Sequence, residues 1–101
     1  MIVVSRPNLK EAVERFKDHL LETHIEAWLK VVKPLKWNSL IDVQETFTRA
    51  DLVGRCLVFN MLHNRYRLIC VVVFKGHTLY FKHLIDHAEY DRKKWKGDCR
   101  E

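Results

Sequence analysis

The residues whose types fit chemistry on a polyanion lie in the second half of the chain. Arg67 and Lys82 carry positive charge, and His87 and Tyr90 lie three residues apart in the segment that follows. A guanidinium presents a planar pair of donors that matches a phosphate, and an imidazole exchanges protons near neutral pH. These four side chains could hold a phosphodiester and move the protons that its cleavage requires.

A protein that cleaves RNA does not have to provide a nucleophile, because the substrate contains one, the 2′-hydroxyl group. The protein has to position the phosphodiester, move two protons and stabilise the developing negative charge, which needs no metal ion or other cofactor. We therefore expect Arg67 to bind the phosphate oxygens with help from Lys82, and His87 to transfer a proton. Tyr90 would orient the substrate or stack on a base. The other residues predicted to bind substrate are Asn64, Arg65 and His83.

Each of these residues also has a purely structural interpretation. An arginine at the start of a strand, such as Arg67, usually forms a surface ion pair. His87 and Tyr90 could pack the first turn of a short helix against the sheet, and Asn64 suits a turn because asparagine tolerates a positive φ. His83 and His87 have the spacing of a zinc-binding pair. Since the first lies in a predicted strand and no third ligand is evident, no metal site is expected.

The elements that position these residues follow from the hydrophobic pattern. Two amphipathic helices are expected near the N-terminus, capped by Asn8 and Thr23, and the second should end near Pro34. Later strand-like runs are separated by short turns, which predicts an antiparallel meander. Residues 68–74 are apolar on both faces and should form the central strand. The four predicted strands are residues 2–4, 55–60, 66–74 and 78–85.

Two stretches complete the predicted architecture. Residues 35–54 have a weak pattern, with one short helical turn and a bend over residues 51–54. A last short helix, begun by Asp86, would carry Tyr90 and Trp95. The expected fold is therefore of the α+β class, with two N-terminal helices packed on a twisted, mostly antiparallel four-stranded sheet and a short C-terminal helix.

The length, charge and cysteine content limit the classes of protein to which this chain can belong. A chain of 101 residues with 48% hydrophobic residues can form one domain over residues 1–101, and no apolar run is long enough to span a bilayer. The formal charge of +5 is concentrated in the second half, which favours a polyanionic partner, although a basic surface that serves solubility accounts for it too. Cys56, Cys70 and Cys99 form no CxxC pair, which predicts free thiols and a cytoplasmic location.

Two motifs resemble those of the HigB branch of the RelE-like toxins. Residues 58–69 are similar to the VFN…N-x-x-RLI signature of that family, and residues 87–91 are similar to its H-x-E-Y-D turn. The motifs stand in the same order and at similar spacing, and the stretch around Trp28 resembles the family's second helix, so the likeness covers nearly the whole chain. The sequence departs from the family at Lys82, which replaces a common arginine, and at Asp86, which replaces threonine.

The resemblance implies a RelE-like fold and a metal-independent endoribonuclease that cuts messenger RNA on the ribosome, an mRNA interferase. It also implies a cytoplasmic toxin that is stored with a helix-turn-helix antitoxin of the HigA kind, while the sequence leaves a homo-oligomer open. One alternative is a ParE-like toxin, which inhibits DNA gyrase and has no RNase activity. Another is a non-catalytic RNA-binding module that uses the basic face alone.

Overall fold

A five-stranded mixed sheet forms the centre of the molecule. In the computed structural model, which describes residues 1–100, the strand order is β1-β5-β4-β3-β2. β1 and β5 are parallel, and the other neighbouring strands are antiparallel. The α+β class and the mostly antiparallel sheet are confirmed, but the predicted number of four strands was wrong. The strands are β1 (Ile2–Val4), β2 (Asp51–Val53), β3 (Cys56–Met61), β4 (Tyr66–Val73) and β5 (Thr78–Asp86).

The additional strand is β2, in the stretch that was expected to be a bend. The chain reverses at Gly54, whose φ is +57°, and β2 pairs with the first half of β3. A side chain at this position would overlap the carbonyl of Cys99, so the reversal requires glycine. The stretch was expected to be a bend because Asp51 and Gly54 are turn-forming residues, whereas the equally short β1 is marked by a run of β-branched residues. The same stretch also holds α3 (Leu40–Thr46), which is longer than the single turn expected.

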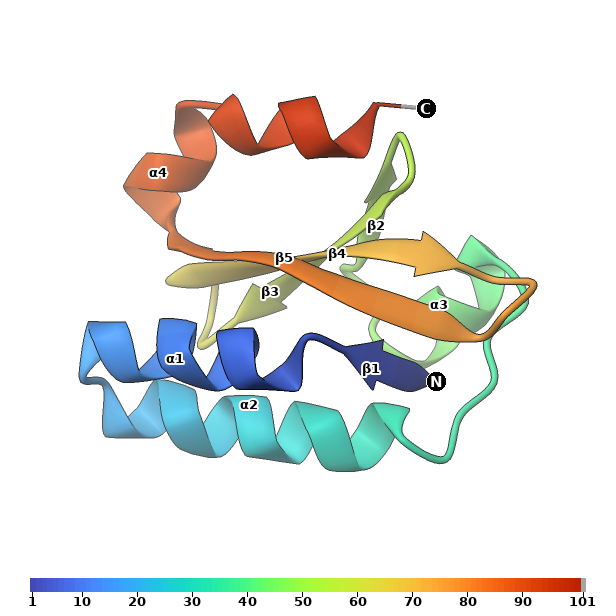
Figure 1. The fold of residues 1–101 in the computed structure, drawn as a ribbon, viewed down its shortest axis with the longest axis horizontal. Coiled ribbons are helices and arrows are strands. Elements are labelled where there is room, and N and C mark those ends of the chain that lie inside the picture. Colours follow the sequence, from blue (N-terminus) through green and yellow to red (C-terminus); the bar gives the residue numbers. More distant parts are fainter. Residues whose placement is uncertain (101) are drawn as a thin grey trace.

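Two antiparallel helices cover one face of the sheet, α1 (Arg6–Phe16) and α2 (His19–Val32) (Figure 1). The predicted caps were wrong at both. The first helix begins after Ser5, which puts Asn8 inside its first turn. The second begins after Asp18, whose carboxylate accepts hydrogen bonds from two backbone N–H groups at 3.1 and 3.3 Å, and Thr23 lies inside it. Its end at Val32, shortly before Pro34, is as predicted.

The central strand is β4, as predicted, and it is buried on both faces. Leu68 and Cys70 pack into the larger core beneath α1 and α2, whereas Ile69 and Val71 pack into a smaller core on the opposite face. Alternate residues of a strand point to opposite sides, so β4 joins the two cores.

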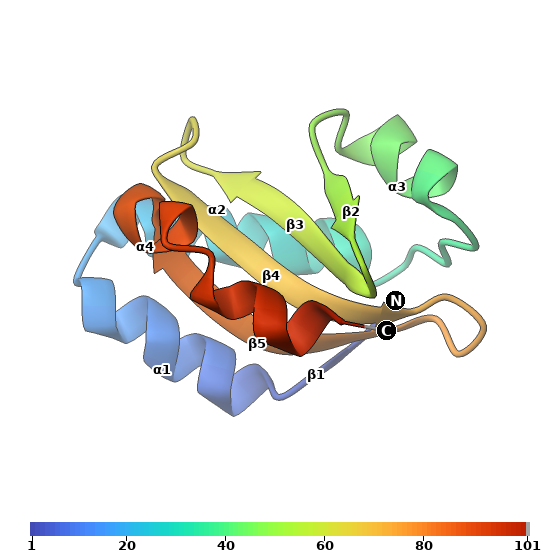
Figure 2. The ribbon, with the colours of Figure 1, turned by 90° about the horizontal axis from the view of Figure 1, so that it is seen from above.

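The opposite face is covered by α4 (His87–Asp91) and a 3₁₀ helix, η1 (Lys94–Cys99) (Figure 2). Asp86 caps α4 as predicted, because its carboxylate accepts a hydrogen bond from the backbone N–H of Glu89 at 2.8 Å. Tyr90 lies in α4, but Trp95 lies in η1 and not in the same helix. Trp95 is the large aromatic side chain of the smaller core.

A disulfide joins Cys56 of β3 to Cys99 of η1, so the prediction of three free thiols was wrong. The two cysteines are 43 residues apart, and only the tertiary fold brings η1 back onto β3. Cys70 is free and buried, and burial raises the pKa of its thiol above the usual range. None of the helices in residues 1–100 combines the length and the apolar character needed to cross a bilayer.

Candidate functional site

Arg67 and Tyr90 meet at the centre of the candidate site. Arg67 is the second residue of β4 and lies on the face covered by α4. Its guanidinium carbon lies 5.0 Å from the centre of the Tyr90 ring, within the range of a cation–π contact. Among residues 1–100, no carboxylate forms an ion pair with this guanidinium. Its charge is therefore available to an anion.

The turn between β3 and β4 orients Arg67. The Nη1 atom donates hydrogen bonds to the carbonyl oxygens of Asn64 at 2.8 Å and of Tyr66 at 3.2 Å. Leu62, His63 and Asn64 have φ angles of 48°, 51° and 75°, in the left-handed region that L-residues rarely adopt. The structural interpretation of Asn64 as a turn residue is thus confirmed. Its side chain remains a predicted contact for a base or a sugar.

His87 lies on the surface at the start of α4, one turn from Asp91. Its Nδ1 atom lies 2.9 Å from the Asp91 carboxylate, and both side chains are exposed. With Nδ1 next to the Asp91 carboxylate, Nε2 is the ring nitrogen left to take or give a proton. His87 also lines a shallow surface pocket with Arg65, so a second positive charge lies near the imidazole.

Tyr66, which also lines this pocket, ties β4 to the start of α2 through a hydrogen bond. The hydroxyl of Tyr66 donates to the carboxylate of Asp18 at 2.8 Å. This hydrogen bond lowers the pKa of Asp18 below its usual range. Burial and the same contact raise the pKa of Tyr66. Asp18 therefore holds the start of α2 and the start of β4 at once.

Lys82 does not lie beside Arg67. The cross-strand partner of Arg67 is Ile85, which is three residues from Lys82 and hence about 10 Å away along β5 at ~3.3 Å per residue. The register shifts next to Lys82, because the residues on either side of it pair with consecutive residues of β4. Lys82 lines a surface pocket with Arg15 of α1. The structure therefore does not bring together the two cations that were expected to share one phosphate.

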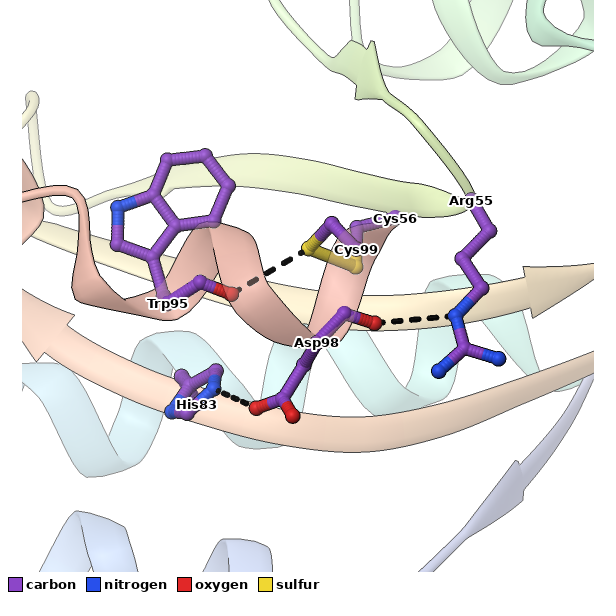
Figure 3. Close-up of a disulfide and its surroundings, with 6 residues drawn as sticks. All are labelled: Arg55, Cys56, His83, Trp95, Asp98 and Cys99. Carbon is purple, nitrogen blue, oxygen red and sulfur yellow. Dashed lines mark hydrogen bonds and ion pairs between the residues drawn. A yellow bond between two sulfur atoms is a disulfide. The ribbon is translucent and has the colours of Figure 1, made fainter. Parts of the chain in front are cut away.

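His83 is engaged with the C-terminal segment. Its Nε2 atom lies 2.6 Å from the carboxylate of Asp98 in η1 (Figure 3). Any contact with substrate would have to compete with this pair. Within residues 1–100, no group of three or more His, Cys, Asp or Glu side chains is arranged to hold a metal ion.

Two residues of the site were not predicted from the sequence. Asp91 is the partner of His87, and the signal was the i, i+4 spacing on a short helix. Trp95 stacks on Tyr90, with ring centres 4.9 Å apart and planes 12° apart, and its Nε1 donates to the carbonyl of Tyr90 at 2.9 Å. No sequence pattern indicated the contacts between Trp95 and Tyr90, because the two residues belong to different helices.

The fold and the site define a small α+β protein in which an arginine, free of any carboxylate among residues 1–100, lies with a stacked tyrosine and a surface histidine at one end of the sheet. Residues 21–93 match the model of the HigB toxin family, described as a RelE-like toxic component of a toxin-antitoxin system. This match spans more than half of the chain, so the chain belongs to the HigB toxin family. The search of curated proteins returned no match.

Proposed function

We propose that this protein cuts messenger RNA on the ribosome as the toxin of a type II toxin-antitoxin system. The observation that carries the proposal is the guanidinium of Arg67, which has no carboxylate partner among residues 1–100 and lies against Tyr90 in α4, the helix whose first residue is His87. RNA cleavage by the 2′-hydroxyl requires a fixed positive charge for the phosphate and a group that transfers protons.

In this reaction the 2′-hydroxyl loses its proton and its oxygen attacks the neighbouring phosphorus. The bond from phosphorus to the 5′-oxygen breaks, the 5′-oxygen receives a proton, and the upstream fragment is left with a 2′,3′-cyclic phosphate. Arg67 stabilises the phosphate charge, and His87 takes one of the two protons or gives the other, with Asp91 holding its ring. Tyr90 supports Arg67 and offers a surface on which a base can stack.

The remaining positive side chains bind the RNA on either side of the cleaved phosphate. Arg65 shares a pocket with His87, and Lys82 lies farther along β5 beside α1. Asn64 and His83 complete the proposed binding residues. The distance between Lys82 and Arg67 favours a role for the lysine in attracting the chain of phosphates over a role at the reacting phosphorus.

The proposed partners follow from the family. A toxin of this kind is made beside an antitoxin, and we expect a helix-turn-helix protein of the HigA kind that keeps it inactive. Since the substrate is ribosome-bound messenger RNA, the proposed location is the cytoplasm.

The deciding experiment adds purified protein to a defined translation reaction and maps new 5′ ends on the message by primer extension. We expect cuts within the translated region that disappear when ribosomes are omitted and when Arg67 is replaced by alanine. Lys75→Ala is the matched control, because it removes one positive charge from the exposed turn at the other end of β4. An intact message together with lost supercoiling by DNA gyrase would instead identify a ParE-like toxin. Binding of RNA without cleavage by any variant would identify a binding module.

A further inference from the structure

The C-terminal segment, residues 94–99, lies outside the stretch that matches the family and is fastened to the sheet at several points. The disulfide from Cys56 to Cys99 joins it to β3, and both cysteines are buried. Arg55 adds two hydrogen bonds. Its backbone N–H donates to the Cys99 carbonyl at 2.9 Å, and its Nε donates to the Asp98 carbonyl at 3.0 Å (Figure 3). The segment is thus tied to the start of β3 and the turn before it by one covalent bond and two hydrogen bonds.

The same segment also contacts the candidate site through Trp95. Trp95 is buried among the side chains of β3 and β4 and lies next to the disulfide in the smaller core. It stacks on Tyr90 and donates a hydrogen bond to the Tyr90 carbonyl, and the Tyr90 ring in turn contacts Arg67. A continuous line of contacts therefore runs from the disulfide through two aromatic rings to the guanidinium.

We propose that Trp95 is a positioning residue for Tyr90 and Arg67, and that the Cys56–Cys99 disulfide makes this support sensitive to the redox state of the solution. The inference rests on the proposed function, because it concerns the efficiency of that site. In the oxidised protein, Tyr90 and Arg67 are held in one arrangement. In the reduced protein, η1 loses its covalent anchor, Trp95 leaves the Tyr90 ring for part of the time, and cleavage becomes slower.

The redox step is thiol–disulfide exchange with a dithiol reductant, such as dithiothreitol in solution or a dithiol protein in a cell. One thiolate of the reductant attacks a sulfur of the disulfide and forms a mixed disulfide, which releases one cysteine. The second thiol then displaces the other cysteine, so that the protein gains two electrons and two protons and the reductant becomes a disulfide. Because both sulfurs are buried, the reductant reaches them when η1 opens. Cys70 stays a thiol throughout, since burial keeps its pKa high.

The test compares Trp95→Ala, Trp95→Phe and the double variant Cys56→Ser/Cys99→Ser in the ribosome assay, each with and without dithiothreitol. We expect Trp95→Ala to cut about 10- to 100-fold more slowly at saturating message, the loss typical of a misplaced catalytic group. Trp95→Phe, which keeps a stacking ring, should retain most of the activity. Reductant should slow the wild-type protein and leave the double serine variant, already slow, unchanged. Leu9→Ala is the control for lost stability, because it truncates a buried side chain in the other core.

A spectroscopic measurement separates this inference from the proposed function. The nuclear magnetic resonance shifts of the Tyr90 ring report the stacked indole whether or not the protein cuts RNA. They should move in Trp95→Ala and on reduction of the wild type, and stay in place in Leu9→Ala. Unchanged shifts on reduction would overturn the inference even if cleavage is observed. Faster cleavage by the reduced protein would overturn it as well, because the segment would then be a cover and not a support. If wild type cuts nothing, the proposed function fails while the shifts still decide whether the segment holds Tyr90.

Discussion

The guanidinium carbon of Arg67 lies 5.0 Å from the centre of the Tyr90 ring. This contact predicts different outcomes for two substitutions of Tyr90. Tyr90→Phe keeps the ring and should retain most of the cleavage activity. Tyr90→Leu removes the aromatic face, and the loss of a cation–π contact of ~0.5–2 kcal/mol should slow cleavage about 2- to 30-fold. The rates are measured at saturating message in the ribosome assay. An equal loss in both variants would contradict this role and assign the phenol hydroxyl to the chemistry.

The pairing of His87 with Asp91 predicts a graded loss of activity. His87→Ala should slow cleavage by about 10²- to 10⁴-fold, the usual contribution of a general acid or base. Asp91→Asn should cost less, because the ring is still present but no longer held by a charge. The control is Glu89→Gln. It removes an acidic group from the same helix, and this group pairs with Arg92 and not with His87. Single-turnover rates provide the comparison. If Asp91→Asn and Glu89→Gln behave alike, Asp91 has no specific part in the site.

The hydrogen bond between Tyr66 and Asp18 predicts a dependence of stability on pH. Because the folded protein lowers the pKa of Asp18, the carboxylate form stabilises the fold. This stabilisation is complete above the ordinary pKa of about 4 and is lost as the pH falls through the lower folded value. Tyr66→Phe removes the hydrogen bond. The difference in free energy of unfolding between wild type and Tyr66→Phe should therefore be constant from about pH 5 to pH 8 and shrink in more acidic solution.

Urea unfolding at a series of pH values measures this difference. Tyr80→Phe is the matched control, since it removes the hydroxyl of an exposed tyrosine on β5. The difference in free energy of unfolding between Tyr80→Phe and wild type should not change with pH in the acid range. A Tyr66→Phe difference that persists undiminished in acid would show that the hydrogen bond does not act through the charge of Asp18.

Most of the helices and strands could be predicted from local patterns in the sequence. The central strand was predictable because residues 68–73 are apolar at every position, and the apolar faces of α1 and α2 were predictable from helical spacing. Asn8 and Thr23 were predicted as caps because each has a glutamate three residues later. Both predictions were wrong, since Pro7 favours an earlier start of α1 and Asp18 caps α2. The strand β2 was not predictable, because Asp51 and Gly54 at its two ends favour a turn.

The site was predictable in its residue types and less so in its geometry. The sequence predicted that Arg67, Lys82 and His87 converge on one phosphate, whereas the aromatic contact of Arg67 in the structure is with Tyr90. The position of Lys82 was not predictable, because a shift in strand register cannot be read from alternation. The link from Cys99 to Cys56 depends on how the C-terminal segment folds back, which no local pattern encodes.

The separation of Lys82 from Arg67 predicts that the two cations contribute to different steps. Each charge that contacts RNA should contribute about 0.7 to the slope of log affinity against log salt for a single strand. Lys82→Ala should therefore weaken the binding of an uncleavable 2′-O-methyl RNA and make it less dependent on salt, with a smaller effect on the cleavage rate at saturating message. Arg67→Ala should abolish cleavage at any concentration of message. A Lys82→Ala protein that loses as much of the saturating rate as Arg67→Ala would put the ammonium group at the reacting phosphate, against the register of β4 and β5.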